Sequence, residues 1–263
     1  MEPLLDGVAE TLLWPLRSRA WQSRRPRSGF HDPLSEKLHD TITYDYRRFG
    51  RPGPAHAVRA AILDREIRAY LAGHPRATVV ALGEGLQTTY WRLGRPDVPW
   101  LTVDLPEVQE LRARFLPAEP GMTAYAGSAL DRAWLDLVDP AHGVFLSAEG
   151  LFMYLDPDAV FALIADCAAR FPGGALFFDS IPAWLSARPR RLSADYTAPP
   201  MPFSLSVSQA LALPTRIPGV ATATDLKAPA SRLLTALADS RVLRDRRPSM
   251  TLLNFNPALS CTS

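Results

Sequence analysis

The sequence of 263 residues predicts an α/β protein in which helices cover both faces of a mostly parallel sheet. Short, continuous apolar runs at 78–82 and 143–147 are typical of strands that are buried on both faces. Amphipathic segments at 55–72 and 156–170 alternate with such runs, as in repeated β-α-β units. Glycine or polar residues directly follow the strands, which is where parallel sheets bind their ligands.

The N-terminal part is expected to be helical. Residues 1–27 mix apolar residues with several arginines and predict one or two short helices. A further helix should begin near residue 33, because Asp32 can cap its first turn and Pro33 suits its first position. Tyr44 and Tyr46 follow in an aromatic segment, where they could line a substrate pocket or pack into the core.

The alternation of strands and helices then continues to the C-terminus. Gly73-His74-Pro75 should end the first long helix. Asp156 and Pro157 should begin a later one. The expected helices are 55–72, 86–93, 106–115 and 156–170, and the expected strands are 78–82, 100–104, 122–126, 143–147, 175–179 and 251–255.

Proline distribution suggests how the chain is divided. Many of the 25 prolines lie within 186–230. Proline fixes φ and lacks a backbone donor, so we expect this segment to be an irregular insertion that forms a lid. The expected parts are an N-terminal helical cap (1–54), an α/β core (55–185), the proline-rich lid (186–230) and a C-terminal completion of the sheet (231–263).

Composition argues against several classes of protein. A formal net charge of +2 does not point to a nucleic-acid partner. The two cysteines form no CxxC motif or His/Cys cluster, so we expect neither a metal site nor a disulfide framework. We read no secretory signal and no run of about 18 apolar residues, which favours a cytoplasmic protein without a membrane partner.

The turn after the first strand carries the first chemical signal. Gly83-Glu84-Gly85 allows positive φ and close approach of the backbone to a ligand. A dinucleotide-binding motif would continue to a glycine where this chain has Thr88, which disfavours an NAD-dependent oxidoreductase. Asp104 ends the second strand and could accept hydrogen bonds from both hydroxyls of a ribose. A nucleoside cofactor without a phosphate at this turn fits both features.

Three segments carry a resemblance to a known family: VVALGEGLQTTYWRL (79–93), WLTVDLPEV (100–108) and SAEGLFMYLDPDAVFALIADCAARFPGGALFFDSIP (147–182). They resemble the leucine carboxyl methyltransferase-like family, and within it the TcmP-like O-methyltransferases of polyketide biosynthesis. The resemblance implies a class I S-adenosylmethionine (SAM) methyltransferase fold, which is Rossmann-like with a seven-stranded sheet. It also implies SAM as cofactor and S-adenosylhomocysteine (SAH) as product.

The resemblance also implies roles for single residues. Arg59 matches an arginine that binds the SAM carboxylate, and Asp104 matches the acid that binds its ribose. Glu149 matches an acid near the methionine moiety, and Tyr154 matches a position close to the site. The expected cofactor-binding residues are Arg59, Gly83, Glu84, Gly85, Gln87, Asp104, Leu105, Ser128, Ala129, Leu130, Glu149 and Gly150.

The resulting hypothesis is an O-methyltransferase that acts by in-line transfer on a small acceptor, a polyketide-like or other secondary metabolite with a hydroxyl or carboxyl group. The sequence names no catalytic residue. The candidates are Tyr154, Tyr44 and Tyr46, and a base could come from the N-terminal histidines His31, His39 and His56.

Two alternatives stay open. One is a methyltransferase for a protein C-terminal carboxylate, as the wider family suggests. The other is a SAM-binding protein that has lost catalysis and serves as a partner or regulator. The second is motivated by departures from the family pattern: Gln87 and Thr89 stand where the family often has aspartate and arginine, and Ser128 stands where it often has aspartate.

Overall fold

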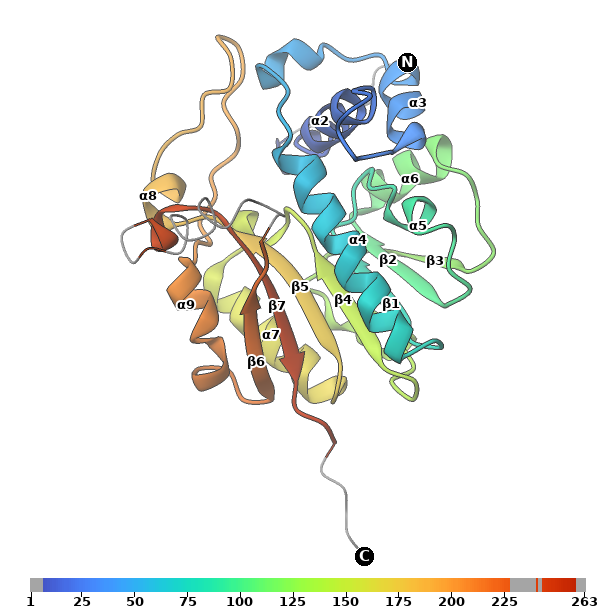
Figure 1. The fold of residues 1–263 in the computed structure, drawn as a ribbon, viewed down its shortest axis with the longest axis vertical. Coiled ribbons are helices and arrows are strands. Elements are labelled where there is room, and N and C mark those ends of the chain that lie inside the picture. Colours follow the sequence, from blue (N-terminus) through green and yellow to red (C-terminus); the bar gives the residue numbers. More distant parts are fainter. Residues whose placement is uncertain (1–6, 228–239, 241–242, 259–263) are drawn as a thin grey trace, which may run out of the picture.

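The computed structural model describes residues 7–227, 240 and 243–258, and its centre is one seven-stranded sheet (Figure 1). The strand order is β3-β2-β1-β4-β5-β7-β6. The first five strands pair in parallel, whereas β7 pairs antiparallel with both β5 and β6. The strands are β1 (Thr78–Leu82), β2 (Trp100–Asp104), β3 (Met122–Ala126), β4 (Val144–Ala148), β5 (Ala175–Ser180), β6 (Val220–Asp225) and β7 (Ser249–Phe255).

The chain direction around β1 marks where a ligand should bind. From β1 the chain continues to β2 and β3 on one side, and then returns to β4 on the other side. Loops that leave β1 and β4 therefore diverge at their carboxyl ends and leave a crevice between them. The α/β class, the largely parallel sheet and the helices on both faces are confirmed.

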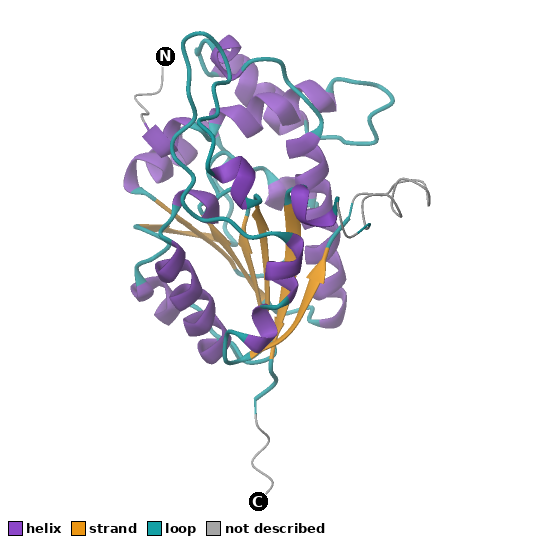
Figure 2. Ribbon diagram, turned by 90° about the vertical axis from the view of Figure 1, so that its left-hand side faces the viewer, coloured by secondary structure: helices purple, strands orange, loops and turns teal. Residues whose placement is uncertain are grey.

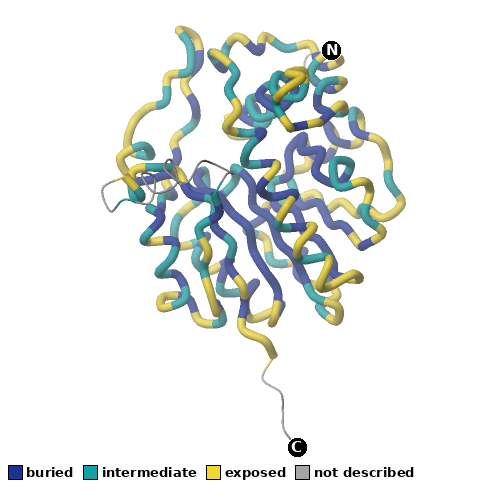
Figure 3. Tube along the Cα trace, viewed as in Figure 1, coloured by how far each residue is buried: buried dark blue, intermediate teal, exposed yellow. Residues whose placement is uncertain are grey.

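Each face of the sheet has its own hydrophobic core. Alternate residues of a strand point to opposite faces. Val79 accordingly packs with Ile62 and Ile67 of α4 (Ala55–Gly73), whereas Val80 packs with Leu163 of α7 (Pro157–Arg170) and its neighbours. Figure 3 shows the central strands as buried. The continuous apolar runs in the sequence follow from this burial on both sides.

Two helices begin where the sequence predicts. Asp32 accepts a hydrogen bond from the Ser35 backbone N–H and caps α3 (Pro33–Thr41). Asp156 does the same for α7 through the Ala159 N–H. The helix α6 (Pro106–Phe115) also has its expected bounds. In all three helices proline occupies the first turn, where its missing donor has no consequence.

Helices and one long segment gather at the carboxyl ends of the parallel strands (Figures 1 and 2). The helices are α1 (Gly7–Glu10), α2 (Leu13–Ser23), α3 and the 3₁₀ helix η1 (Tyr46–Phe49). The segment after β5, with α8 (Ala183–Ser186), meets them there: the Phe49 and Tyr196 rings lie 5.0 Å apart. Both parts contribute to one hydrophobic cluster, which covers this end of the sheet.

Two parts of the fold differ from expectation. The helix α5 spans only Thr89–Arg92 and not 86–93. The reason is that the Leu86 carbonyl and the Thr88 hydroxyl bond to Arg19 and Asp32 of the N-terminal part, in place of an additional helical turn.

The irregular character expected of 186–230 is also wrong in part. The segment contains α9 (Val207–Leu211), the 3₁₀ helix η4 (Leu213–Thr215) and β6. β6 lies between the last two prolines of the segment, Pro218 and Pro229, and most of its residues are exposed or half-buried, as in an edge strand. A strand at the sheet edge needs no continuous apolar run, so the sequence did not reveal it. Of the expected C-terminal part, 231–239, 241–242 and 259–263 lie outside the described residues.

Candidate functional site

A cavity of about 650 Å³ lies at the carboxyl ends of the parallel strands. Its walls come from the turns after β1, β2, β3 and β4, from the end of β5 and from the N-terminal helices. All the residues that the sequence predicts for cofactor binding line it, except Leu130: Arg59, Gly83, Glu84, Gly85, Gln87, Asp104, Leu105, Ser128, Ala129, Glu149 and Gly150. The Leu130 side chain packs instead against the hydrophobic core beneath the cavity.

The glycine turn forms one edge of the cavity. Gly83 and Gly85 have φ of +59° and +53°, which side chains larger than glycine rarely adopt. A Cβ on Gly83 would lie 2.7 Å from Leu151 Cδ1. The Gly85 N–H donates to Asp104 Oδ2 at 2.7 Å, and the Leu105 N–H donates to Oδ1 at 2.9 Å. Burial raises the pKa of Asp104, while these two donors lower it.

Glu84 lies under this turn. Arg112 Nη2 is 2.8 Å from its Oε2, and Arg112 Nη1 also donates to the Gly85 carbonyl at 2.5 Å. Among the described residues neither carboxylate oxygen has a well-directed hydrogen bond. Burial accordingly raises the pKa of Glu84 to about 7, despite the neighbouring guanidinium. We interpret Glu84 as a residue that holds the turn, since its carboxylate is directed at Arg112.

Arg59 connects two acidic residues at the ends of β4 and β5. Its Nε donates to Glu149 Oε1 at 2.8 Å, and its Nη1 donates to Asp179 Oδ2 at 2.7 Å. The Gly150 N–H donates to the other Asp179 oxygen at 2.5 Å. These carboxylates raise the pKa of Arg59, against the effect of its burial. Glu149 Oε2 is buried and has no hydrogen-bond partner among the described residues.

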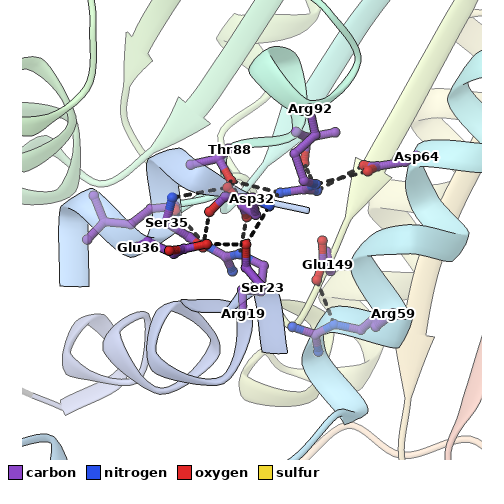
Figure 4. A network of polar contacts seen from close by, with 12 residues as sticks. Arg19, Ser23, Asp32, Ser35, Glu36, Arg59, Asp64, Thr88, Arg92 and Glu149 are labelled. Atoms are coloured by element: carbon purple, nitrogen blue, oxygen red, sulfur yellow. Dashed lines mark hydrogen bonds and ion pairs between the residues drawn. The ribbon is translucent and has the colours of Figure 1, made fainter. Parts of the chain in front are cut away.

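A buried polar network fixes the N-terminal helices to the glycine turn (Figure 4). Asp32 accepts hydrogen bonds from Thr88 Oγ1 at 2.7 and 2.8 Å and from Arg92 Nη1 at 3.2 Å. Arg19 of α2 contacts Asp32 and donates to the Leu86 carbonyl at 2.7 Å. The turn after β1 and the cap therefore share hydrogen bonds.

The positions that depart from the family pattern are structurally accommodated. Thr89 accepts a hydrogen bond from Arg92 Nη2 at 3.0 Å. Ser128 Oγ accepts one from the Leu130 N–H at 3.1 Å. Gln87 lines the cavity, and its buried Oε1 has no partner among the described residues. The turn is thus intact without the usual aspartate and arginine.

Of the three tyrosine candidates, only Tyr154 lines the cavity. Tyr44 donates to Glu10 and stacks on Phe49, and it borders a separate surface groove with Tyr46. Of the two possibilities that the sequence leaves open for Tyr44 and Tyr46, the structure shows packing into the core, because their rings lie among the cap helices. Burial raises the pKa of Tyr154, so its hydroxyl stays protonated at neutral pH.

Several lining residues were not predicted from the sequence, among them Trp14, Arg19, Asp179 and Arg190, and the role of His56 was left open. Of the histidines considered above, His56 alone lines the cavity. Burial, reinforced by nearby arginines, lowers its pKa well below 6.5. No motif could reveal Trp14 and Arg190, because only the folded chain brings them together.

Two features are absent from the parts of the chain that the structure covers. No helix there is long and apolar enough to span a bilayer. Across the same residues, no three His, Cys, Asp or Glu side chains are grouped as metal ligands would be.

Comparison with known proteins agrees with this geometry. The model of the leucine carboxyl methyltransferase family matches residues 13–168. The tetracenomycin polyketide synthesis O-methyltransferase TcmP of Streptomyces glaucescens is 33% identical over 220 residues, which cover 82% of this chain and 81% of that protein.

Solved structures share the fold. A duf574 family protein from Streptomyces avermitilis superimposes with a TM-score of 0.56 and 13% identity, over 92% of this chain and 97% of that one. A SAM-dependent methyltransferase from Mesorhizobium loti gives 0.50 and 16%, over 75% and 99%. The family match covers more than half of the chain and includes Arg59, the glycine turn, Asp104 and Glu149. This chain therefore belongs to the leucine carboxyl methyltransferase family of SAM-dependent methyltransferases.

Proposed function

We propose that the chain methylates an oxygen of a small acceptor, a polyketide-like or other secondary metabolite with a hydroxyl or carboxyl group. One observation carries the proposal. The cavity that contains the expected cofactor residues is also lined by apolar and aromatic side chains from the cap and from the segment after β5, among them Trp14, Met153, Ile181 and Met201. A single chamber thus offers polar groups for a cofactor and an apolar wall for an acceptor.

The residues of the polar part suit SAM. Gly83 and Gly85 leave room for its amino-acid portion, and Asp104 has oxygen lone pairs left for the ribose hydroxyls. The buried, unpartnered Glu149 Oε2 suits the ammonium group. Arg59 suits the carboxylate, and Ser128 and Ala129 would flank the adenine.

When bound, SAM supplies a methyl group that is already activated on a sulfonium. The protein then has to position the acceptor oxygen and exclude water. His56 is uncharged at neutral pH, because burial and nearby arginines lower its pKa, so a ring nitrogen can accept a hydrogen bond from an acceptor hydroxyl. Tyr154 keeps its proton and can donate a hydrogen bond from its hydroxyl.

The curated relative supports the acceptor class, because its name places it in polyketide synthesis. Segments 1–54 and 186–230 would act as cap and lid, and the choice of acceptor would lie with them. Methylation of a protein C-terminal carboxylate would need room for a peptide beside the cofactor.

The test is incubation of the purified protein with methyl-labelled SAM and matched pairs of aromatic acceptors that carry either a hydroxyl or a carboxyl group. A peptide with a C-terminal leucine forms a third arm. Alkali releases methanol from a methyl ester but not from an aryl ether, so it identifies the methylated oxygen. Label in a small acceptor supports the proposal, and label in the peptide alone supports a protein substrate. SAH binding without transfer to any arm would favour a protein that has lost catalysis.

A further inference from the structure

Arg190 differs from the other cations of the cavity in its partners. Arg59 contacts two carboxylates, and Arg19 contacts Asp32. Within the described ranges no carboxylate lies within ion-pair distance of Arg190. Its guanidinium instead lies over the Trp14 ring, with the central carbon 4.9 Å from the ring centroid. A guanidinium stacked in this way keeps its N–H groups available around its edge.

The backbone aims Arg190 into the cavity. Its carbonyl accepts a hydrogen bond from the Ala198 N–H at 2.9 Å, and the next residue forms a bridge with Thr197. The Arg191 N–H also donates to the Pro189 carbonyl at 3.2 Å, so the backbone turns at Arg190 and separates the directions of the two arginine side chains. Arg190 accordingly lines the cavity, whereas Arg191 is exposed and donates to the Ser193 and Ala194 carbonyls.

The surroundings of Arg190 combine positive charge with aromatic surface. Trp14 also contacts the His56 ring edge to face, with centroids 5.1 Å apart. The guanidinium of Arg190 is among the charges that lower the pKa of His56, after burial, Arg59 and Arg19. It likewise lowers the pKa of Tyr154, against the larger effect of burial. This end of the cavity therefore presents a cation without a carboxylate partner in the described chain, beside an indole face.

We propose that Arg190, held over Trp14, is a specificity-determining residue that selects acceptors with an anionic oxygen group on an aromatic body. This inference rests on the proposed function, since it concerns the acceptor half of the same cavity. The anion would be a carboxylate or an ionised phenol, both of which accept hydrogen bonds from a guanidinium edge. Trp14 would hold the guanidinium over its ring face and contribute its ring edge to the contact with the aromatic body.

The experiment measures calorimetric binding of small probes to the full-length protein saturated with SAH. The probes are 2-naphthoate, its neutral analogue 2-naphthamide, and 2-naphthol at a pH below and a pH above its own pKa. Variants are Arg190→Gln and, as the matched control, Arg191→Gln, which makes the same change at the exposed neighbour. Arg190→Lys tests whether charge alone is sufficient.

We expect the wild type to bind naphthoate or ionised naphthol at least about tenfold more tightly than naphthamide. Arg190→Gln should remove this preference and leave naphthamide and SAH binding within about twofold, whereas Arg191→Gln should change neither. Arg190→Lys should retain part of the preference. Whether naphthoate or ionised naphthol shows the effect identifies the anion.

Three results would overturn the inference. The first is equal binding of charged and neutral probes to the wild type, and the second is no binding of either anion. The third is that Arg190→Gln loses binding of all probes in parallel, because this would indicate a role in lid packing. SAH binding is measured before any probe is added. Absence of SAH binding would contradict the proposed function and not the inference about Arg190.

Discussion

The Asp104 carboxylate and the Gly85 backbone N–H are joined by a hydrogen bond of 2.7 Å, which fixes the end of β2 to the turn after β1. With the Leu105 N–H on its other oxygen, the carboxylate has a defined orientation at the cavity wall. The geometry of the turn depends on this side chain, and under the proposed function recognition of the cofactor ribose would depend on it as well.

Replacement of this carboxylate should weaken cofactor binding. In Asp104→Asn an amide NH₂ replaces one acceptor oxygen and would face an N–H donor. We expect SAH affinity to fall at least about tenfold, because hydrogen bonds to a charged group contribute about 1.5–3 kcal/mol. Calorimetric titration checks this, with Asp97→Asn at an exposed acid as the control. Unchanged affinity in Asp104→Asn would remove Asp104 from the cofactor site.

Loss of the Arg59 charge should destabilise the fold. Arg59→Met leaves Glu149 and Asp179 buried without their cation, and breaking such a pair costs about 3–5 kcal/mol. Urea unfolding measures the change. Arg65→Met on the same helix removes an exposed arginine paired with Glu66 and should shift stability by less than about 0.5 kcal/mol. Similar small effects in both variants would contradict the buried ion-pair account.

Gly83 should be intolerant of a side chain for two separable reasons. Gly83→Ala meets both an unfavourable φ and Leu151 at 2.7 Å. Gly94→Ala is the matched control, because Gly94 has φ of +84° but no atom within 4 Å of a Cβ. We expect Gly94→Ala to lower stability by about 1 kcal/mol and Gly83→Ala by about 3 kcal/mol. SAH affinity should fall only in Gly83→Ala. Equal effects would show that the contact with Leu151 is unimportant.

Glu84 should make stability depend on pH. Its pKa is about 7 in the folded chain and near 4.5 when unfolded, so the folded state holds the proton more strongly. The stabilisation from this proton is complete below about pH 4.5 and disappears as the pH rises through about 7. The wild type should therefore lose up to about 3 kcal/mol across this window relative to Glu84→Gln. Unfolding of both proteins at pH 5 and pH 8 measures it, and parallel pH profiles would refute the assignment.

Local signals in the sequence predict much of the fold. Asp32-Pro33 and Asp156-Pro157 mark helix starts through capping chemistry that depends on a few neighbouring residues. The buried strands are recognisable because burial on both faces demands continuous apolar runs. The same runs predict where the polar residues after β1, β2 and β4 converge, and the cavity contains them.

What the sequence does not predict depends on contacts between distant segments. The turn at 86–88 is not helical, because Arg19 and Asp32 bond to Leu86 and Thr88 across more than fifty residues of chain. The strand β6 exists through its pairing with β7, and most of its own residues are exposed or half-buried. Arg190 meets Trp14 only after the segment that follows β5 folds over the cap.

If the cavity at the strand ends is a SAM site, calorimetric titration of the full-length protein with SAM, SAH and NADH should reveal it. We expect one binding site each for SAM and SAH, and none for NADH. Binding of NADH without SAM, or no binding of SAM and SAH at millimolar concentration to a well-folded sample, would show that the cavity does not bind SAM.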